Sequence, residues 1–340
     1  GRQSKTIHRL LEVDFRDGAG TVFKRDERNT LPADVIVVDE MSMVDTLLFQ
    51  SLLRAMKLGC RLVMVGDTDQ LPSVGPGNVL KDLIEADVIP TVHLQEIFRQ
   101  AAQSDIIVNA HRINAGERIP IGKSSRDFLF IKRDDPNAII NAMITLVREK
   151  LPNYVHADLF EVQVMTPMRK GVLGSIRLNS ILQEFLNPPS AEKAEKEYGE
   201  TTFRVGDKVM QNKNTEEVSN GDIGYITGVE SMDDSFTVEV DFGDSRLVLY
   251  QTVEALGHLE LAYATTIHKS QGGEHMSVLI SIQGGRMLQR SLIYTAITRA
   301  KLAATIVGSW SAVAYAIENN NEQERCTHLA ARLNELQNCA

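Results

Sequence analysis

Two adjacent carboxylates follow an apolar run in the segment VIVVDEMSMVD, where Asp39 and Glu40 come directly after Val38. A strand that ends in paired acids suits nucleotide hydrolysis, because one acid can hold Mg²⁺ through water while its neighbour polarises the attacking water. We assign Asp39 to the metal and Glu40 to the water. Taken alone, the dipeptide is equally well explained if Asp39 caps the following helix and Glu40 is merely exposed.

A second apolar run, in RLVMVGDTDQLPSVGPG, ends at Gly66 and Asp67 and is followed by Gln70. The Gln70 amide can donate and accept hydrogen bonds, so it could sense a γ-phosphate and relay its presence to the loop. The same residue types are good turn formers, and for the isolated segment a polar turn is the simpler interpretation.

Two arginines each lie near the end of a helical stretch: Arg99 in LQEIFRQ and Arg299 in LIYTAITRAK. A planar guanidinium that reaches across a cleft neutralises charge that develops on a transferred phosphoryl group. Most arginines lie at the surface or in ion pairs, so neither residue identifies such a role without its context.

Two further segments, LAYATTIHKSQGGEH and VMTPMRKGVLG, place hydroxyl, amide and basic groups after apolar strands. The residues concerned are Thr266, His268, Lys269 and Ser270 in the first, and Thr166, Pro167, Arg169 and Lys170 in the second. Such groups can contact a phosphate backbone without reading base sequence. A packed histidine and a solvated basic turn are the plainer alternatives.

The elements that must position these residues predict an α/β fold. Apolar runs at 35–38 and 61–65 flank a helical pattern over 41–56, as in a doubly wound sheet. Because the run 35–38 is continuous, we expect a central parallel strand that is buried on both faces. Ligands of such sheets bind at the carboxyl ends of strands, which is where Asp39, Glu40 and Asp67 fall.

A second α/β region follows Pro90. Strands are expected at 128–132, 162–167, 259–268, 277–282 and 303–308, helices at 137–151, 174–186 and 292–299, and a helical tail after Trp310. Short strands separated by Gly, Asn and Asp interrupt this region from 201 to 253, after a charged stretch at 191–200, and predict a small inserted β-barrel. Residues 11–25 predict a hairpin. The expected domains are 1–90, 91–200 with 254–340, and 201–253.

Composition restricts the class of protein. The chain has 340 residues, of which 43% are hydrophobic and 24% charged, as in globular proteins rather than disordered or coiled-coil ones. Three scattered cysteines favour a reducing compartment, with the cytoplasm as the default. Without a signal pattern or long apolar run, no membrane partner is expected. The formal charge of −9 argues against a positively coated protein but leaves a local phosphate-binding groove open.

Taken together and in this order, six segments resemble motifs of the RecD-like helicases of superfamily 1, the exodeoxyribonuclease V alpha-subunit family, which move 5′ to 3′ on single-stranded DNA. They are TIHRLL, VIVVDEMSMVD, VMVGDTDQLPSVGPG, FRQ, TIHKSQGGE and YTAITRAK, between about Thr6 and Gly308. The resemblance implies two RecA-like motor domains of the P-loop NTPase type, the first incomplete. It also implies a β-hairpin pin at 11–25 and an SH3-like barrel at about 201–253.

The resemblance implies a role for each matching position. Asp39 and Glu40 would be the Walker B pair for Mg²⁺ and ATP, Gln70 the γ-phosphate sensor, and Arg99 and Arg299 the arginine fingers. Near the nucleotide would lie Gly272 and Glu274. The DNA contacts would be His8, Pro72, Thr166, Pro167, Arg169, Lys170, Thr266, His268, Lys269 and Ser270. The implied partners are single-stranded DNA, duplex junctions and other recombination-complex subunits, with ATP hydrolysis coupled to unwinding in DNA repair and recombination.

One motif of that family, the phosphate-binding loop G-x-x-x-x-G-K-[ST], does not occur in this sequence. The backbone amides and lysine of that loop cradle the nucleotide phosphates. We therefore expect a fragment of a longer helicase, which by itself binds ATP poorly and hydrolyses little. The alternative is a non-catalytic module that binds single-stranded DNA and keeps the helicase fold. Nuclease activity lacks support, because no further acidic cluster has metal-site spacing.

Overall fold

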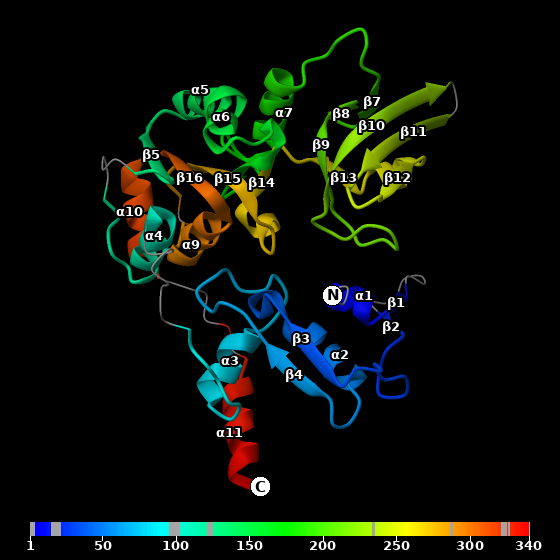
Figure 1. Ribbon diagram of the computed structural model, residues 1–340, viewed down its shortest axis with the longest axis vertical. Coiled ribbons are helices and arrows are strands. Elements are labelled where there is room, and N and C mark those ends of the chain that lie inside the picture. Colours follow the sequence, from blue (N-terminus) through cyan, green and yellow to red (C-terminus); the bar gives the residue numbers. More distant parts are fainter. Residues whose placement is uncertain are drawn as a thin grey trace. The chain divides into compact units, whose positions relative to one another are not determined.

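The structure is a computed structural model that describes residues 4–14, 22–94, 103–120, 125–232, 235–285, 288–320, 325 and 327–339 (Figure 1). The chain forms two compact units: residues 1–96 with 322–340 make the first, and residues 97–321 the second. Both units contain a parallel sheet with helices, so the expected α/β class is confirmed. No helix among the described residues is long and apolar enough to cross a membrane.

A two-stranded parallel sheet lies in the first unit. β3 (Val35–Val38) and β4 (Arg61–Met64) are connected through the 3-10 turn η1 (Met41–Met43) and α2 (Thr46–Ala55). The carboxylate of Asp45 caps α2 by accepting a hydrogen bond from the Leu48 amide at 2.8 Å. Apolar side chains of both strands form one core with α2 and α3 (Val79–Ala86). The strand–helix–strand pattern is therefore confirmed.

The expectation that β3 is buried on both faces is wrong. Ile36 and Val38 are buried, but Val35 and Val37 are 47% and 64% exposed, and Val63 of β4 is 46% exposed. Successive side chains of a strand point to opposite faces, and the core of this unit lies on one of them. Since parallel sheets are normally covered on both faces, the valines form an uncovered apolar surface within this unit.

Both ends of the chain contribute to the first unit. After α1 (Ile7–Leu10), β1 (Val13–Asp14) pairs with β2 (Val22–Phe23), as the hairpin expected at 11–25 requires; the tip lies outside the described residues. The helical tail is present as α11 (Leu329–Cys339), which packs on α3. Residues 329–339 therefore belong to the first unit, whereas the sequence predicted that they belong to the second domain, with the rest of 254–340.

A five-stranded parallel sheet forms the centre of the second unit, with the strand order β14-β6-β15-β16-β5. The strands are β5 (Phe128–Lys132), β6 (Val162–Thr166), β14 (Ala264–Thr266), β15 (His275–Ile282) and β16 (Ala300–Gly308). The helices around it are α4 (Asp105–Asn114), α5 (Pro136–Thr145), the π-helix η3 (Leu146–Lys150), α6 (Leu151–Val155), α7 (Ser175–Leu186), α9 (Arg290–Thr298) and α10 (Trp310–Glu318). All of β6 is buried, as expected for a strand inside such a sheet.

An all-β segment, residues 201–261, is inserted between α7 and β14; we call it the β-module. Its five strands pair antiparallel in the order β12-β11-β10-β9-β13. They are β9 (Lys208–Gln211), β10 (Ile223–Met232), β11 (Ser235–Asp241), β12 (Leu247–Tyr250) and β13 (Leu259–Leu261), with α8 (Val253–Leu256) before β13. The hairpin of β7 (Glu195–Tyr198) and β8 (Thr201–Arg204) precedes them, so part of the charged stretch 191–200 is a strand.

The β-module and the parallel sheet share one core, in which Val209 and Val240 belong to the same cluster as Val164 and Leu279. Side-chain amides on α7 and directly after it also connect the β-module to the parallel-sheet domain through hydrogen bonds. Asn179, Gln183 and Asn187 lie four residues apart, on one side of the helix. Gln183 and Asn187 donate to the buried Asp207 carboxylate at 2.6 and 2.7 Å. Burial raises the pKa of Asp207, and these hydrogen bonds oppose that shift.

Candidate nucleotide and nucleic-acid site

The acidic residues of the first unit lie at one edge of its sheet. Asp39 and Glu40 follow β3, and Asp67 follows β4, which runs parallel to β3. The structure therefore brings together the two acidic loops that the sequence predicts at the carboxyl ends of these strands.

A close backbone contact holds the two loops together. The Met41 amide donates to the Val65 carbonyl at 2.9 Å. A Cβ atom on Gly66 would lie 3.0 Å from the Met41 nitrogen and 2.8 Å from a Leu80 methyl carbon, so the approach requires a glycine.

Glu40 adopts a left-handed backbone conformation, with φ 52° and ψ 43°. Its amide donates to Asp39 Oδ1 at 2.8 Å. This conformation costs a non-glycine residue about 1–3 kcal/mol, and residues held in it cluster at functional sites. It also occurs at six other described non-glycine residues of this chain, so it supports a site only together with the adjacent acidic loop. Asp39 is exposed, which suits Mg²⁺, because that ion keeps several waters and needs few protein ligands. No group of three or more His, Cys, Asp or Glu that could hold a metal occurs in the part of the chain that the structure describes.

Gln70 lies in the loop after β4, and Asp67 organises the turn that carries it. One Asp67 oxygen accepts from the Asp69 amide at 2.9 Å, and the other from Gln70 Nε2 at 3.4 Å. A hydrogen bond of 3.4 Å is weak.

Arg299 follows α9 in the second unit and is 3% exposed. Its guanidinium Nη1 donates to the Gly273 carbonyl at 3.4 Å, and its own carbonyl accepts from the His275 amide at 2.9 Å. The structure thus joins Arg299 to the turn that contains the predicted nucleotide residues Gly272 and Glu274.

The remaining predicted nucleotide residues differ in their surroundings. Gly272 is exposed and has φ +74°, a conformation that favours glycine. Glu274 is exposed and forms an ion pair with Lys301 at 2.9 Å, so its carboxylate balances the charge of that lysine. Arg99 lies outside the described residues.

His275 is a residue that the motif analysis did not single out. Its Nε2 lies 3.2 Å from the Ser270 hydroxyl. Burial, together with the charges of Lys208, Arg299 and Lys301, lowers the pKa of His275 to about 4, so the imidazole is neutral at pH 7. The available signal was a polar residue at the start of an otherwise apolar strand, directly after TIHKSQGGE.

The two predicted DNA-contacting turns of the second unit lie side by side. Thr166 at the end of β6 pairs with Thr266 at the end of β14. The Glu260 carboxylate forms one ion pair with Arg169, at 3.7 Å, and another with Lys269. One carboxylate therefore holds a basic residue from each turn at the same edge of the sheet.

The side chains of these turns are not equally accessible. Thr166 is fully buried, and its hydroxyl donates to the Leu173 carbonyl at 2.6 Å, so it stabilises the turn instead of facing solvent. Ser270 is also buried. Pro167, Thr266 and Lys269 are half-buried, and Arg169, Lys170 and His268 are exposed.

Two predicted DNA-contacting residues, His8 and Pro72, belong to the first unit and are half-buried. The His8 ring lies 5.9 Å from the Phe23 ring, centroid to centroid. Burial lowers the pKa of His8, and the charge of Asp45 opposes that shift. Pro72 precedes the buried Ser73 in the loop after Gln70.

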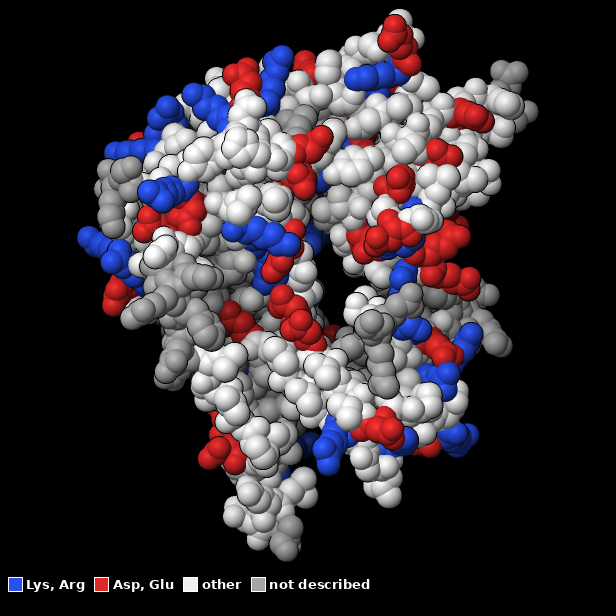
Figure 2. All heavy atoms as spheres, viewed as in Figure 1, with Lys and Arg blue, Asp and Glu red and all other residues white. Residues whose placement is uncertain are grey.

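Negative charge is concentrated in the β-module. Residues 201–261 contain 12 Asp and Glu against 4 Lys and Arg, which accounts for most of the formal charge of −9. Figure 2 shows acidic side chains gathered over this module. Phosphates are repelled by such a surface.

Three family models match the chain. An AAA domain matches residues 1–127, the SH3 domain of ATP-dependent RecD-like DNA helicases matches residues 178–242, and a UvrD-like helicase C-terminal domain matches residues 261–307. The ATP-dependent RecD2 DNA helicase of Deinococcus radiodurans is 37% identical over 337 residues, which is 98% of this chain and 44% of that protein. The chain belongs to the RecD-like helicase family.

The RecD subunits among the curated relatives agree with this assignment. The RecBCD enzyme subunit RecD of Mycobacterium tuberculosis is 31% identical to the RecD-like chain over 334 residues, covering 92% of this chain and 55% of the subunit. The chain thus spans about half the length of the curated relatives it matches. Among solved structures, the chain is similar to a Pif1 helicase from a study of DNA unwinding at forked dsDNA. The match covers 88% of this chain and 77% of the Pif1 chain, with 16% identity and a TM-score of 0.49.

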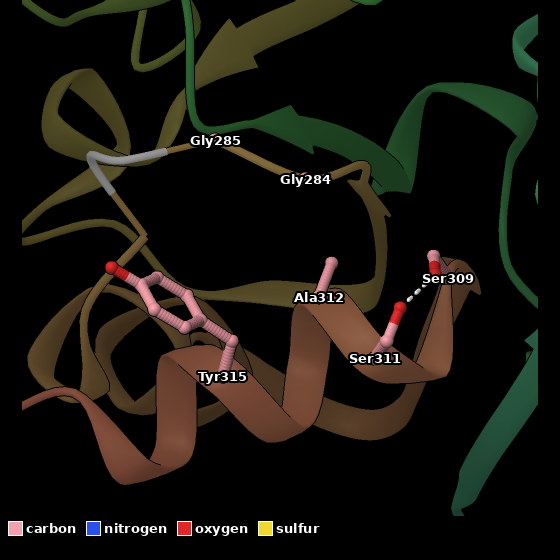
Figure 3. A pocket seen from close by; sticks show the side chains of 6 residues that line it. All are labelled: Gly284, Gly285, Ser309, Ser311, Ala312 and Tyr315. Atoms are coloured by element: carbon pink, nitrogen blue, oxygen red, sulfur yellow. Dashed lines mark hydrogen bonds between the residues drawn. The ribbon is translucent and has the colours of Figure 1, made fainter.

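The RecD-like chain also has a cavity of about 450 Å³ near the carboxyl ends of β15 and β16. Its described lining is Gly284, Gly285, Ser309, Ser311, Ala312 and Tyr315. In Figure 3 the hydroxyls of Ser309 and Ser311 form a hydrogen bond at one end of the pocket, at 2.8 Å, and the Tyr315 ring lies at the other end. None of the described lining side chains is charged.

Proposed function

We propose that this chain is part of an ATP-dependent motor that moves 5′ to 3′ along single-stranded DNA and separates duplex strands. The main support is the pair of acidic loops, which contain Asp39 with Glu40 and Asp67 with Gln70, at one edge of a parallel sheet in a RecD-like chain. Nucleotides bind at such edges in α/β proteins.

In this proposal the first unit acts on the terminal phosphate of ATP. Asp39 holds Mg²⁺, Glu40 orients the attacking water and takes its proton, and Gln70 contacts the γ-phosphate. Mg²⁺, when bound with ATP, neutralises charge on the β- and γ-phosphates. Arg299, and Arg99 as the second expected arginine, stabilise the charge that develops on the transferred phosphoryl group.

The basic turns of the second unit hold the DNA strand. The exposed side chains of Arg169, Lys170 and His268 bind phosphates without reading base sequence. Affinity for single-stranded DNA therefore falls as the salt concentration rises. The relatives named as RecBCD enzyme subunit RecD support other recombination-complex subunits as further partners. Duplex junctions are the second DNA structure in this proposal.

A non-catalytic module that binds single-stranded DNA is the second candidate. The observation that favours it is the absence of G-x-x-x-x-G-K-[ST] from this sequence.

ATP hydrolysis by the Glu40→Gln variant tests the proposal. Loss of the general base lowers kcat by about 10²–10⁴-fold, while nucleotide affinity stays within a few-fold. Glu85→Gln is the matched control, because Glu85 is an exposed residue of α3 in the same unit. Equal turnover by the two variants would refute the role of Glu40. If the unaltered chain binds single-stranded DNA equally with and without ATP, and supplying an upstream G-x-x-x-x-G-K-[ST] loop produces no hydrolysis, the non-catalytic module is correct.

A further inference from the structure

Arg325 lies in the segment that returns to the first unit after the second α/β domain. Its guanidinium makes four hydrogen bonds to the loop after Gln70. Nη1 donates to the Gly75 and Gly77 carbonyls, each at 2.7 Å, and Nη2 donates to the Ser73 carbonyl at 2.7 Å. Nη1 also lies 3.4 Å from the Ser73 hydroxyl. One side chain from near the C-terminus therefore binds a loop that precedes it by about 250 residues.

The backbone of residues 73–77 depends on this contact. The carbonyls of Ser73, Gly75 and Gly77 converge on the guanidinium, while the Pro76 carbonyl accepts from the Thr46 amide at 2.9 Å. Backbone carbonyls that are partly buried require partners. A guanidinium offers five donors in a fixed plane, so it can satisfy several converging carbonyls at once, which a lysine ammonium cannot do with the same geometry.

The same loop packs against the start of α2, close in sequence to Asp39 and Glu40. A Cβ on Gly75 would overlap the Asp45 carboxylate, which caps α2. Gly77 has φ +91°, and a Cβ at this position would overlap the Thr46 hydroxyl. The loop thus connects three features: the capped end of α2, the Gln70 turn that precedes it in the chain, and Arg325.

We infer that Arg325 is a positioning residue that holds the loop of residues 73–77, and through it Gln70, in one conformation. The C-terminal segment is then a working part of the acidic edge rather than a tail of the second α/β domain. The role for Gln70 rests on the function proposed above; the clamp on the loop does not. Leu329 and Leu333 anchor α11 in the core independently, so a change at Arg325 leaves that helix in place.

Hydrogen exchange and NMR on the full 340-residue chain test this inference, with Arg325→Ala and Arg325→Lys as variants. Arg332→Ala is the control, because Arg332 is an exposed arginine on α11. We expect amides of residues 73–78 to exchange at least about tenfold faster in Arg325→Ala, an intermediate rate in Arg325→Lys, and no change in the control. The Gln70 side-chain amide resonances shift in Arg325→Ala alone, and dilute guanidinium partly restores both signals.

Unchanged exchange in Arg325→Ala would overturn the clamp, whether or not the chain hydrolyses ATP. Faster loop exchange with an unmoved Gln70 resonance would overturn the positioning of Gln70. Where hydrolysis is measurable, Arg325→Ala lowers kcat more than it raises KM, since the γ-phosphate contact matters most as charge develops. Absence of hydrolysis even with a supplied G-x-x-x-x-G-K-[ST] loop would defeat the proposed function, but the exchange and NMR results would still decide the role of Arg325.

Discussion

Replacing Asn179 with alanine removes the side chain that ties α7 to the point where the β-module returns to the parallel sheet. The Asn179 amide donates to the Leu261 and Ala264 carbonyls at 2.7 and 2.9 Å, and its oxygen accepts from the Ala264 amide at 2.7 Å. The side chain is nearly inaccessible, since the residue is 9% exposed. All three backbone groups lose this partner in Asn179→Ala.

Each buried polar group that is left without a partner costs about 1–3 kcal/mol. Some of that loss is recovered by relaxation and by water, so we expect unfolding of the second unit to become easier by about 2–4 kcal/mol. For a unit of this size, the melting temperature then falls by about 5–15 °C. Differential scanning calorimetry measures both quantities.

Asn141→Ala is the matched control, because Asn141 is exposed on α5. Its melting temperature stays close to that of the unaltered chain, since exposed substitutions change stability by about 0.5 kcal/mol or less. If Asn179→Ala and Asn141→Ala have the same melting temperature, the hydrogen bonds of Asn179 do not stabilise the junction between α7 and the end of the β-module. The polar connection described for this helix is then incorrect.

Two further outcomes follow from single positions. The pKa of His275 is lowered to about 4, so the unfolded chain binds a proton that the folded chain does not; stability is complete above the ordinary histidine value of about 6.5 and falls as pH drops towards 4. Melting curves from pH 4 to 7 should show a smaller loss for His275→Gln, and parallel curves would contradict the assignment. Gly75→Ala forces a methyl group into the Asp45 carboxylate and should destabilise the first unit by more than about 1 kcal/mol. Gly284→Ala, with open space around its Cβ, should melt like the unaltered chain, and equal melting of the two variants would show that the loop adjusts freely.

Several elements could be predicted because their causes are local. Apolar runs bounded by turn residues indicated β3, β4, β6 and β15, and helical spacing of apolar residues indicated α2, although its cap is Asp45 rather than Asp39. The acidic residues could be placed at strand ends for the same reason, since a residue that directly follows an apolar run in the sequence lies at the end of the strand that the run forms. The motif order was sufficient for the RecD-like family, because six ordered matches constrain far more than one.

Other features arise between segments that are distant in the chain, and no local pattern predicts them. The four apolar residues of β3 could not reveal that one face of their sheet is uncovered, because exposure depends on which helices pack there. Thr166 carries a hydroxyl suited to phosphate contact, yet a carbonyl seven residues later accepts its hydrogen bond. Arg325 is one arginine among many in the sequence, and its role appears only when residues 73–77 lie around it.

The sequence by itself determined the family, the α/β class and the two acidic loops of this protein, because periodicity, turn residues and ordered motifs act over a few residues. Only the tertiary structure decided which polar groups are buried, which partners satisfy them, and that the C-terminal helix belongs to the first unit. The physical reason is that burial and hydrogen-bond satisfaction depend on contacts between segments far apart in sequence. His275 and Arg325 owe the roles described here to such contacts.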